Sequence, residues 1–414
     1  MVGPELKRKL AILSDAAKYD ASCASSSAPR RNSLDGAGVG STEGMGICHA
    51  YAPDGRCISL LKILLTNFCI YDCAYCVNRV SSNTPRARFS VKEVVDLTLG
   101  FYKRNYIEGL FLSSGIIKSA DYTMEAMVRV AKALRLDHDF RGYIHLKLIP
   151  EASPELVAEA GLYADRVSIN IELPSDDSLK ALAPEKDGRV IKKAMSAVRL
   201  GIDQRAQDRK SRSRVKPAPF AAAGQSTQMI VGADQASDHD ILGRSEALYG
   251  GYALKRVYYS AFSPMQDAAK SLPLSKPPLM REHRLYQADW LLRFYGFGRE
   301  EITGGLPAGM LDLSVDPKLG WALAHRGRFP VDVNRADREL LLRVPALGVS
   351  SVDRLIALRR QKRVRLEDVR RLCRNIAKVK PFIVAEDWTP GASTDAADLK
   401  ARLPPEAPRQ LSLF

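Results

Sequence analysis

The chain has 414 residues, of which 46% are hydrophobic and 26% charged, and its formal net charge at pH 7 is +15. This length allows one or two domains with a sizeable core. The absence of any run of about eighteen apolar residues excludes a membrane-spanning protein. The positive charge favours a polyanionic partner such as nucleic acid or an acidic membrane surface, with improved solubility as the alternative explanation.

The first 57 residues indicate a partly flexible N-terminal extension. Residues 1–20 alternate charged and apolar side chains and lack the apolar core of a secretory signal peptide. Residues 21–46 are rich in Ala, Ser and Gly, which is typical of a loop or flexible segment. We therefore expect a cytoplasmic protein with no membrane partner. In that reducing compartment, clustered cysteines are more often metal ligands than disulfides.

Residues 58–300 alternate short apolar runs with helical patterns. One helix is predicted to begin at Ser90, because Glu93 three residues later completes a capping box. Six strand–helix units in succession predict an α/β fold, a partial (β/α)6 barrel of the TIM type, whose chemistry gathers at the carboxyl ends of the strands. The predicted strands begin with ISLLKILLTN at residue 58 and continue with 109–115, 143–149, 165–172, 226–232 and 254–262.

Three cysteines directly follow the first predicted strand. Cys69, Cys73 and Cys76 have the spacing C-x3-C-x2-C within one loop. Three thiolates suit a [4Fe-4S] cluster in which one iron has no protein ligand, whereas a structural zinc site usually takes two separated pairs of ligands. The alternatives are a structural zinc site or a set of buried thiols.

With Tyr75 immediately before the last cysteine, this motif resembles the radical S-adenosylmethionine (SAM) superfamily. The resemblance implies that the open iron binds the amino and carboxylate groups of SAM. It also implies that one electron from the reduced cluster splits SAM into methionine and a 5′-deoxyadenosyl radical, which takes a hydrogen atom from the substrate. An electron donor such as flavodoxin or ferredoxin would then be a partner.

The same resemblance implies further cofactor contacts at other strand ends. Ser113, Ser114 and Gly115 occupy the place of a glycine-rich stretch that contacts the methionine amino group, but serines replace the common residues and no acid follows. Asn170 and Glu172, at the fourth strand, fall where ribose or sulfonium contacts occur, and the fifth strand is similar to the segment along the adenine. The alternative is that all of these are ordinary strand-end polar residues.

The same resemblance allows a second iron–sulfur cluster. Cys23, Cys48 with its neighbour His49, and Cys57 precede the first strand, and some members of the superfamily hold a second iron–sulfur cluster there. Their spacing is long and irregular, which favours ordinary thiols instead. Cys373 lies in a helical pattern and is expected to be packed.

The C-terminal part begins with a linker at 301–330 and continues with a basic helical region at 331–385. Residues 331–380 hold 14 Lys and Arg against 6 Asp and Glu, which is about half of the net charge. The turn VPALGVSS resembles a helix-hairpin-helix module, a small all-α domain that presents backbone amides to a DNA phosphate. The resemblance assigns DNA contacts to Pro345, Leu347, Gly348 and Ser350, and Gly348 would permit a tight turn. A hairpin used only for packing is the alternative.

Two further segments are expected to be exposed. Residues 204–219 are basic and contain two prolines, so they predict a loop that either guides nucleic acid or is merely solvated. Residues 386–414 predict a flexible tail. Its end, QLSLF, resembles the motif that binds the replication sliding clamp, and the resemblance assigns that contact to Gln410, Leu411, Leu413 and Phe414.

Residues 5–390 as a whole resemble the radical SAM proteins described as DNA modification or repair enzymes, on the segments CIYDCAYCVNR and GQSTQMIVGAD and the hairpin. The leading hypothesis is radical chemistry on a base or sugar in DNA, with Tyr258 and Tyr259 as residues that could stack a base or relay a hydrogen atom. The alternatives are modification of RNA such as tRNA, or a non-enzymatic iron–sulfur scaffold associated with DNA.

Overall fold

The computed structural model describes residues 3–19, 31–32, 41–42, 47–51, 57–210, 217, 219–265 and 272–404. The chain divides into two compact units. The first contains Met1–Gln235 and Ala247–Pro277, and the second contains Ala236–Glu246 and Pro278–Ser412. Within the described part of the chain, no helix is long and apolar enough to cross a membrane.

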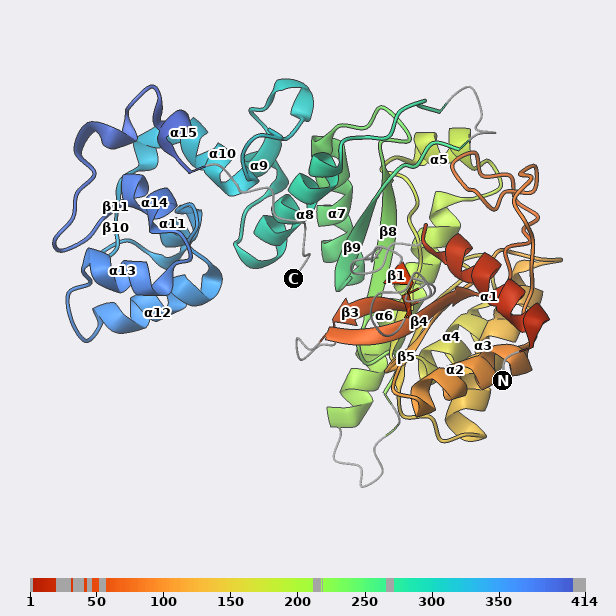
Figure 1. The fold of residues 1–414 in the computed structure, drawn as a ribbon. Coiled ribbons are helices and arrows are strands. Elements are labelled where there is room, and N and C mark those ends of the chain that lie inside the picture. The colour runs from red at the N-terminus through yellow and green to blue at the C-terminus, as the bar shows by residue number, and fades with distance from the viewer. Residues whose placement is uncertain are drawn as a thin grey trace. The chain divides into compact units, whose positions relative to one another are not determined.

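A curled seven-stranded sheet with the order β3-β4-β5-β6-β7-β8-β9 forms the first unit (Figure 1). The last six strands run parallel to one another, so the predicted partial barrel is confirmed. The strand β3 (Ile47–Tyr51), which was not predicted, pairs antiparallel with β4. The parallel strands are β4 (Cys57–Leu64), β5 (Gly109–Ser113), β6 (Tyr143–Lys147), β7 (Arg166–Ser168), β8 (Gln225–Val231) and β9 (Arg256–Ala261). A separate two-residue ladder joins β1 (Arg31–Asn32) and β2 (Ser41–Thr42).

Helices follow the strands, as the alternating pattern predicts. The capping box is confirmed: Ser90 Oγ accepts from the Glu93 amide at 3.2 Å, and Glu93 Oε2 accepts from the Ser90 amide at 2.7 Å. Helices α2, α4 and α6 contact strands of the sheet, and α3 packs between α2 and α4. The helices are α2 (Val91–Lys103), α3 (Ala120–Leu136), α4 (Pro154–Tyr163), α5 (Asp176–Leu182), α6 (Gly188–Lys210) and α7 (Asp238–Tyr252), the last shared by both units.

The N-terminal extension contains a helix, α1 (Pro4–Ala17), that the sequence analysis missed. This helix contacts β4, with Leu13 and Ala17 fully buried. Lys9 Nζ also lies 2.8 Å from a carboxylate oxygen of Glu93 on α2. Part of the region before residue 57, helix α1, therefore packs against the barrel.

The basic stretch predicted as a loop at 204–219 is helical in its first part. Helix α6 continues to Lys210, because residues 204–210 are Gln, Arg, Ala, Asp and Lys, which are mostly good helix formers on an exposed helix end. Residues 211–216 and 218 lie outside the described residues. The prediction of a loop is thus wrong for residues 204–210, whereas their predicted exposure is confirmed for most of them.

The second unit begins earlier than the sequence indicates. The helix predicted to close the barrel, α8 (Leu279–Phe294), belongs to the second unit and contacts α10 (Pro317–Ala324). The stretch 301–330 is not an extended linker: Phe297 and Trp321 are buried and meet edge to face at 5.5 Å. It also contains the end of α9 (Arg299–Thr303) and the 3₁₀ turns η2 (Pro307–Gly309) and η3 (Arg326–Arg328). Apolar packing, which single-sequence patterns reveal poorly, sets this boundary.

The rest of the second unit is mainly helical, with one correction to the all-α prediction. Strands β10 (Val331–Asp332) and β11 (Ile383–Val384) form a short parallel pair. Residues 386–404, predicted as part of a flexible tail, pack against the unit: Leu399 is buried and Lys400 pairs with Asp312 at 2.8 Å. The elements are α11 (Arg338–Arg343), α12 (Val349–Arg359), α13 (Leu366–Leu372), α14 (Ile376–Val379), η4 (Lys380–Phe382), η5 (Gly391–Thr394) and α15 (Leu399–Arg402).

The turn between α11 and α12 differs in detail from the expectation. Ala346 has φ +60°, whereas Gly348 has φ −85° and caps the N-terminus of α12. Pro345 and Leu347 are buried, Gly348 is half-buried and Ser350 is exposed. The left-handed conformation of this turn is therefore adopted by Ala346, and Gly348 needs no special backbone freedom.

A buried lysine on α10 supports this turn and makes the stability of the protein depend on pH. Lys318 Nζ donates to the Leu347 carbonyl at 2.6 Å, and burial lowers the pKa of Lys318 to about 7. From about pH 7 to about pH 10 the unfolded chain then binds a proton that the folded chain does not, so stability rises with pH. We expect the unfolding free energy of the native protein to rise relative to Lys318→Met from about pH 7 to about pH 9 in denaturant titrations. A constant difference between the two proteins would contradict this.

Candidate active site

The three motif cysteines lie in the loop that follows β4, at the carboxyl ends of the parallel strands. All three line one open cavity, with about 1240 Å³ of empty space including its mouth. The loop is held by backbone hydrogen bonds from Cys76 to the Cys73 carbonyl (2.9 Å), from Ile70 to Ile116 (2.8 Å) and from Ala74 to Leu182 (2.7 Å). The loop is therefore fixed to the segment that follows β5 and to the end of α5.

Arg86 holds the cysteine loop from the other side, and the sequence analysis did not identify it. Its guanidinium donates to the carbonyl oxygens of Asn78 at 2.8 Å, Arg79 at 2.5 Å and Ser82 at 3.0 Å. It also donates to the Asn67 carbonyl. Since a guanidinium presents its N–H donors in one rigid plane, a single side chain fixes both flanks of the loop.

The stretch Ser113–Gly115 lies against the cysteine loop and lines the same cavity. The Gly115 amide donates to the Thr66 carbonyl at 2.7 Å. A Cβ atom on Gly115 would lie 2.3 Å from the Phe68 carbonyl oxygen. Glycine is thus required here because two backbone segments approach closely.

Asn170 and Glu172 follow β7 and also line the cavity. Glu172 has φ +68°, a conformation that is costly for a residue with a Cβ atom. Its carboxylate pairs with Lys186 Nζ at 2.5 Å, and the two side chains are only 9% and 17% exposed. Lys186, in the turn before α6, was missed because nothing in its local sequence distinguishes it from a surface lysine.

Of the three motif cysteines, Cys73 is buried, whereas Cys69 and Cys76 are half-buried. Burial raises the pKa of Cys73 to about 12 and raises the pKa of Cys76, and the positive charge of Lys186 opposes both shifts. A coordinating metal deprotonates a thiol outright, so these groups suit metal binding better than reactivity in water.

Several buried polar atoms around the cavity have no hydrogen-bond partner among the described residues. They are the Tyr75 hydroxyl, the Asn78 side-chain oxygen and both carboxylate oxygens of Glu151. Buried polar groups are normally satisfied, because leaving one unpaired costs about 1–3 kcal/mol. With three thiols on one wall, these atoms make the cavity fit a cluster and a polar cofactor that brings its own hydrogen-bonding groups.

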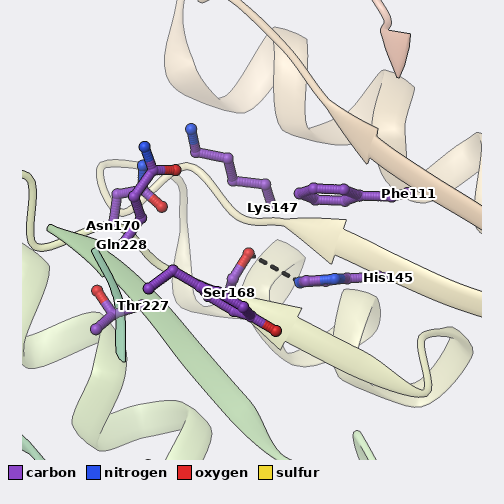
Figure 2. A pocket seen from close by; sticks show the side chains of 8 residues that line it. Phe111, His145, Lys147, Ser168, Asn170, Thr227 and Gln228 are labelled. Atoms are coloured by element: carbon purple, nitrogen blue, oxygen red, sulfur yellow. Dashed lines mark hydrogen bonds between the residues drawn. The ribbon is translucent and has the colours of Figure 1, made fainter. Parts of the chain in front are cut away.

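A deeper pocket inside the barrel is shown in Figure 2. Lys147, Asn170 and Gln228 line both this pocket and the cavity at the cysteines, so the two adjoin. His145 Nε2 lies 3.0 Å from Ser168 Oγ, and its ring stacks on Phe111 at 4.3 Å (Figure 2). The interior of the barrel is therefore lined largely by polar side chains that pack closely against one another, and the open space lies in the cavity at the cysteines.

Those of the remaining predicted site residues that the structure describes do not line this cavity. Cys48 is buried on β3 opposite Leu60 and packs with Ile58 and Phe111, whereas Cys57 is exposed at the start of β4. Cys23 and the four tail residues Gln410, Leu411, Leu413 and Phe414 lie outside the described residues. Cys373, expected to be packed, is half-buried at the end of α13. Of the two tyrosines, Tyr258 lines the deeper pocket and Tyr259 is buried.

The described residues contain no group of three His, Cys, Asp or Glu side chains placed to hold a single metal ion. The three motif cysteines face a common cavity instead. A [4Fe-4S] cluster distributes its iron atoms over several thiolates and takes its ligands around a larger body than one ion.

Several solved structures are similar to parts of this chain. The FeFe-hydrogenase maturase HydG from Carboxydothermus hydrogenoformans is 14% identical over 55% of this chain and 50% of its own, with a TM-score of 0.41. A radical SAM methyltransferase from Sphaerobacter thermophilus is 14% identical over 58% and 64%, with a TM-score of 0.39. The methyltransferase TsrM from Kitasatospora setae is 12% identical over 49% and 36%, with a TM-score of 0.34. The chain therefore covers less than two thirds of each of these proteins.

The sequence was also compared with curated proteins and with family profiles. No curated protein has a sequence that matches this chain. Residues 63–205 match the family profile of the Radical SAM superfamily, and this segment includes the three cysteines, Ser113–Gly115, Asn170, Glu172 and Lys186. Residues 63–205 are therefore similar to the domain shared by the Radical SAM superfamily, whose members are enzymes.

Proposed function

We propose that the protein uses a [4Fe-4S] cluster and SAM to modify or repair a base or sugar in DNA. Cys69, Cys73 and Cys76 would hold the cluster, and Tyr75, Ser113–Gly115, Asn170 and Glu172 would contact the cofactor. When bound, the cluster supplies the single electron that cleaves SAM for radical chemistry. The chain itself orients both molecules and keeps water away from the reacting atoms.

The observation that supports a nucleic-acid substrate is the positive surface of the second unit. Arg354, Arg360 and Arg374 are exposed, and no described residue forms an ion pair with them. They lie in or near α12 and α13, close in sequence to the turn at Gly348 and Ser350. Phosphate contacts of this kind position a nucleic acid without reading its sequence.

A base stacked in a duplex could not reach the cavity, so a flipped nucleotide or a single-stranded substrate is required. Asn170 and Gln228 line the open cavity at the cysteines, where they would hydrogen-bond to a base or sugar. Docking of the QLSLF segment on the sliding clamp and an electron donor such as flavodoxin or ferredoxin stay predictions.

Binding of the full-length protein to a DNA duplex tests the substrate class. We expect the double variant Arg354→Glu/Arg360→Glu to bind duplex DNA at least about tenfold more weakly than the native protein and to show a smaller salt dependence, because fewer phosphates are neutralised. Fluorescence anisotropy at several salt concentrations measures both quantities.

The matched control is the double variant Lys92→Glu/Arg129→Glu, which makes the same charge change on exposed positions of α2 and α3. It should bind DNA almost as the native protein does. Equal weakening by both double variants would mean that net charge alone drives binding. Equal binding of a structured RNA competitor would instead favour the RNA-modifying alternative.

A further inference from the structure

Two carboxylates line the cavity at the cysteines, and they have different surroundings. Among the described lining residues, only Glu151 and Glu172 are acidic. Glu172 pairs with Lys186 at 2.5 Å, so its charge is compensated within the chain. Lys186, one of the two lysines that line the cavity, is thus already paired with one of the two acids.

Glu151 is the acid whose bonding is incomplete. It follows β6 by four residues, and both of its carboxylate oxygens are buried without a hydrogen-bond partner among the described residues. Burial is the main cause that raises the pKa of Glu151; the charge of Lys186 and the backbone amide of Glu151 itself oppose the shift, and the negative charge of Glu172 adds to it. A carboxylate held like this gains strongly from a donor that arrives with a ligand.

The cofactor of radical SAM enzymes brings such a donor. The methionine part of SAM carries one amino group, which donates hydrogen bonds, and one carboxylate, which accepts them. The segment Ser113–Gly115 lines the same cavity but offers no carboxylate to the amino group, whereas Glu151 offers two carboxylate oxygens that accept from no other described residue.

We propose that Glu151 accepts hydrogen bonds from the amino group of SAM and so fixes the methionine part of the cofactor against the cysteine loop. This inference rests on the use of SAM within the proposed function and is independent of the nucleic-acid substrate. Glu151, four residues after the end of β6, would thus position the cofactor, although no local sequence pattern marks it.

Ligand binding to the anaerobically reconstituted protein tests this role without relying on catalysis. The two ligands are SAM and 5′-methylthioadenosine, which has the same adenosine part but lacks the amino acid portion. For Glu151→Gln we expect the Kd for SAM, measured by calorimetry, to rise about tenfold or more, as befits the loss of a charge-assisted hydrogen bond. The Kd for 5′-methylthioadenosine should not change.

The matched control is Glu155→Gln, an isosteric change of an exposed acid in the first turn of α4. It should leave both Kd values unchanged. Native affinity of Glu151→Gln for SAM would overturn the inference, and so would an equal loss of affinity for both ligands, because that would indicate a structural role. A native protein that binds no SAM would reject the cofactor itself together with this contact. A failure to bind DNA would reject only the proposed substrate.

Discussion

Replacing Cys73 with alanine is expected to abolish both the iron–sulfur chromophore and the cleavage of SAM. Cys73 is buried at the centre of the motif loop, and its carbonyl also accepts the amide of Cys76. With two thiolates left, the loop cannot provide the three ligands that the proposed cluster needs. The measurements are bound iron, the visible absorption spectrum and the amount of 5′-deoxyadenosine formed from SAM with dithionite.

Cys373→Ala is the control for this prediction. Cys373 is half-buried at the end of α13 in the second unit, and its replacement should leave iron content and SAM cleavage at native levels. If the Cys73→Ala protein retained SAM cleavage, the assignment of the three cysteines as ligands would be wrong.

The second large effect is expected from Gly115→Ala, which adds only one methyl group. The new Cβ atom would lie 2.3 Å from the Phe68 carbonyl oxygen, and backbone rather than a flexible side chain would have to move. Overpacking typically destabilises a protein by about 1–3 kcal/mol. Because the displaced segment leads directly into Cys69, we also expect a clear loss of bound iron, measured together with the unfolding free energy.

Gly100→Ala is the matched control, since it makes the same chemical change where the structure has room. Gly100 lies within α2, and a Cβ atom there would meet nothing within 4 Å. Alanine favours a helix over glycine by about 0.8–1.0 kcal/mol, so this variant should be as stable as the native protein or more stable. A Gly115→Ala protein with native stability and iron content would show that the close approach of the two segments is not required.

The sequence predicts the barrel well because its signals are local. Apolar runs such as 109–115 and the capping box at Ser90 each lie within a few residues, and the structure has elements at these places. The cysteine spacing and Tyr75 are equally local. Directly after the first strand, they identify the loop that lines the cavity.

The sequence does not reveal the residues that complete the cavity through tertiary contacts. Lys186 donates a hydrogen bond to Glu172, which lies 14 positions earlier in the chain. Arg86 donates one to a carbonyl oxygen 19 positions earlier. Glu151 is distinguished only by burial without a partner, which no sequence pattern records. The sequence pattern of α8 shows which face of the helix is apolar. It does not show which unit that face packs against, and the helix belongs to the second unit.

Electron paramagnetic resonance of the anaerobically purified, reduced protein tests the radical SAM assignment most directly. The account predicts the signal of a reduced [4Fe-4S] cluster that changes when SAM is added, because SAM binds to the iron without a cysteine ligand. A preparation that holds zinc, or a cluster whose signal is unaffected by saturating SAM, would contradict it.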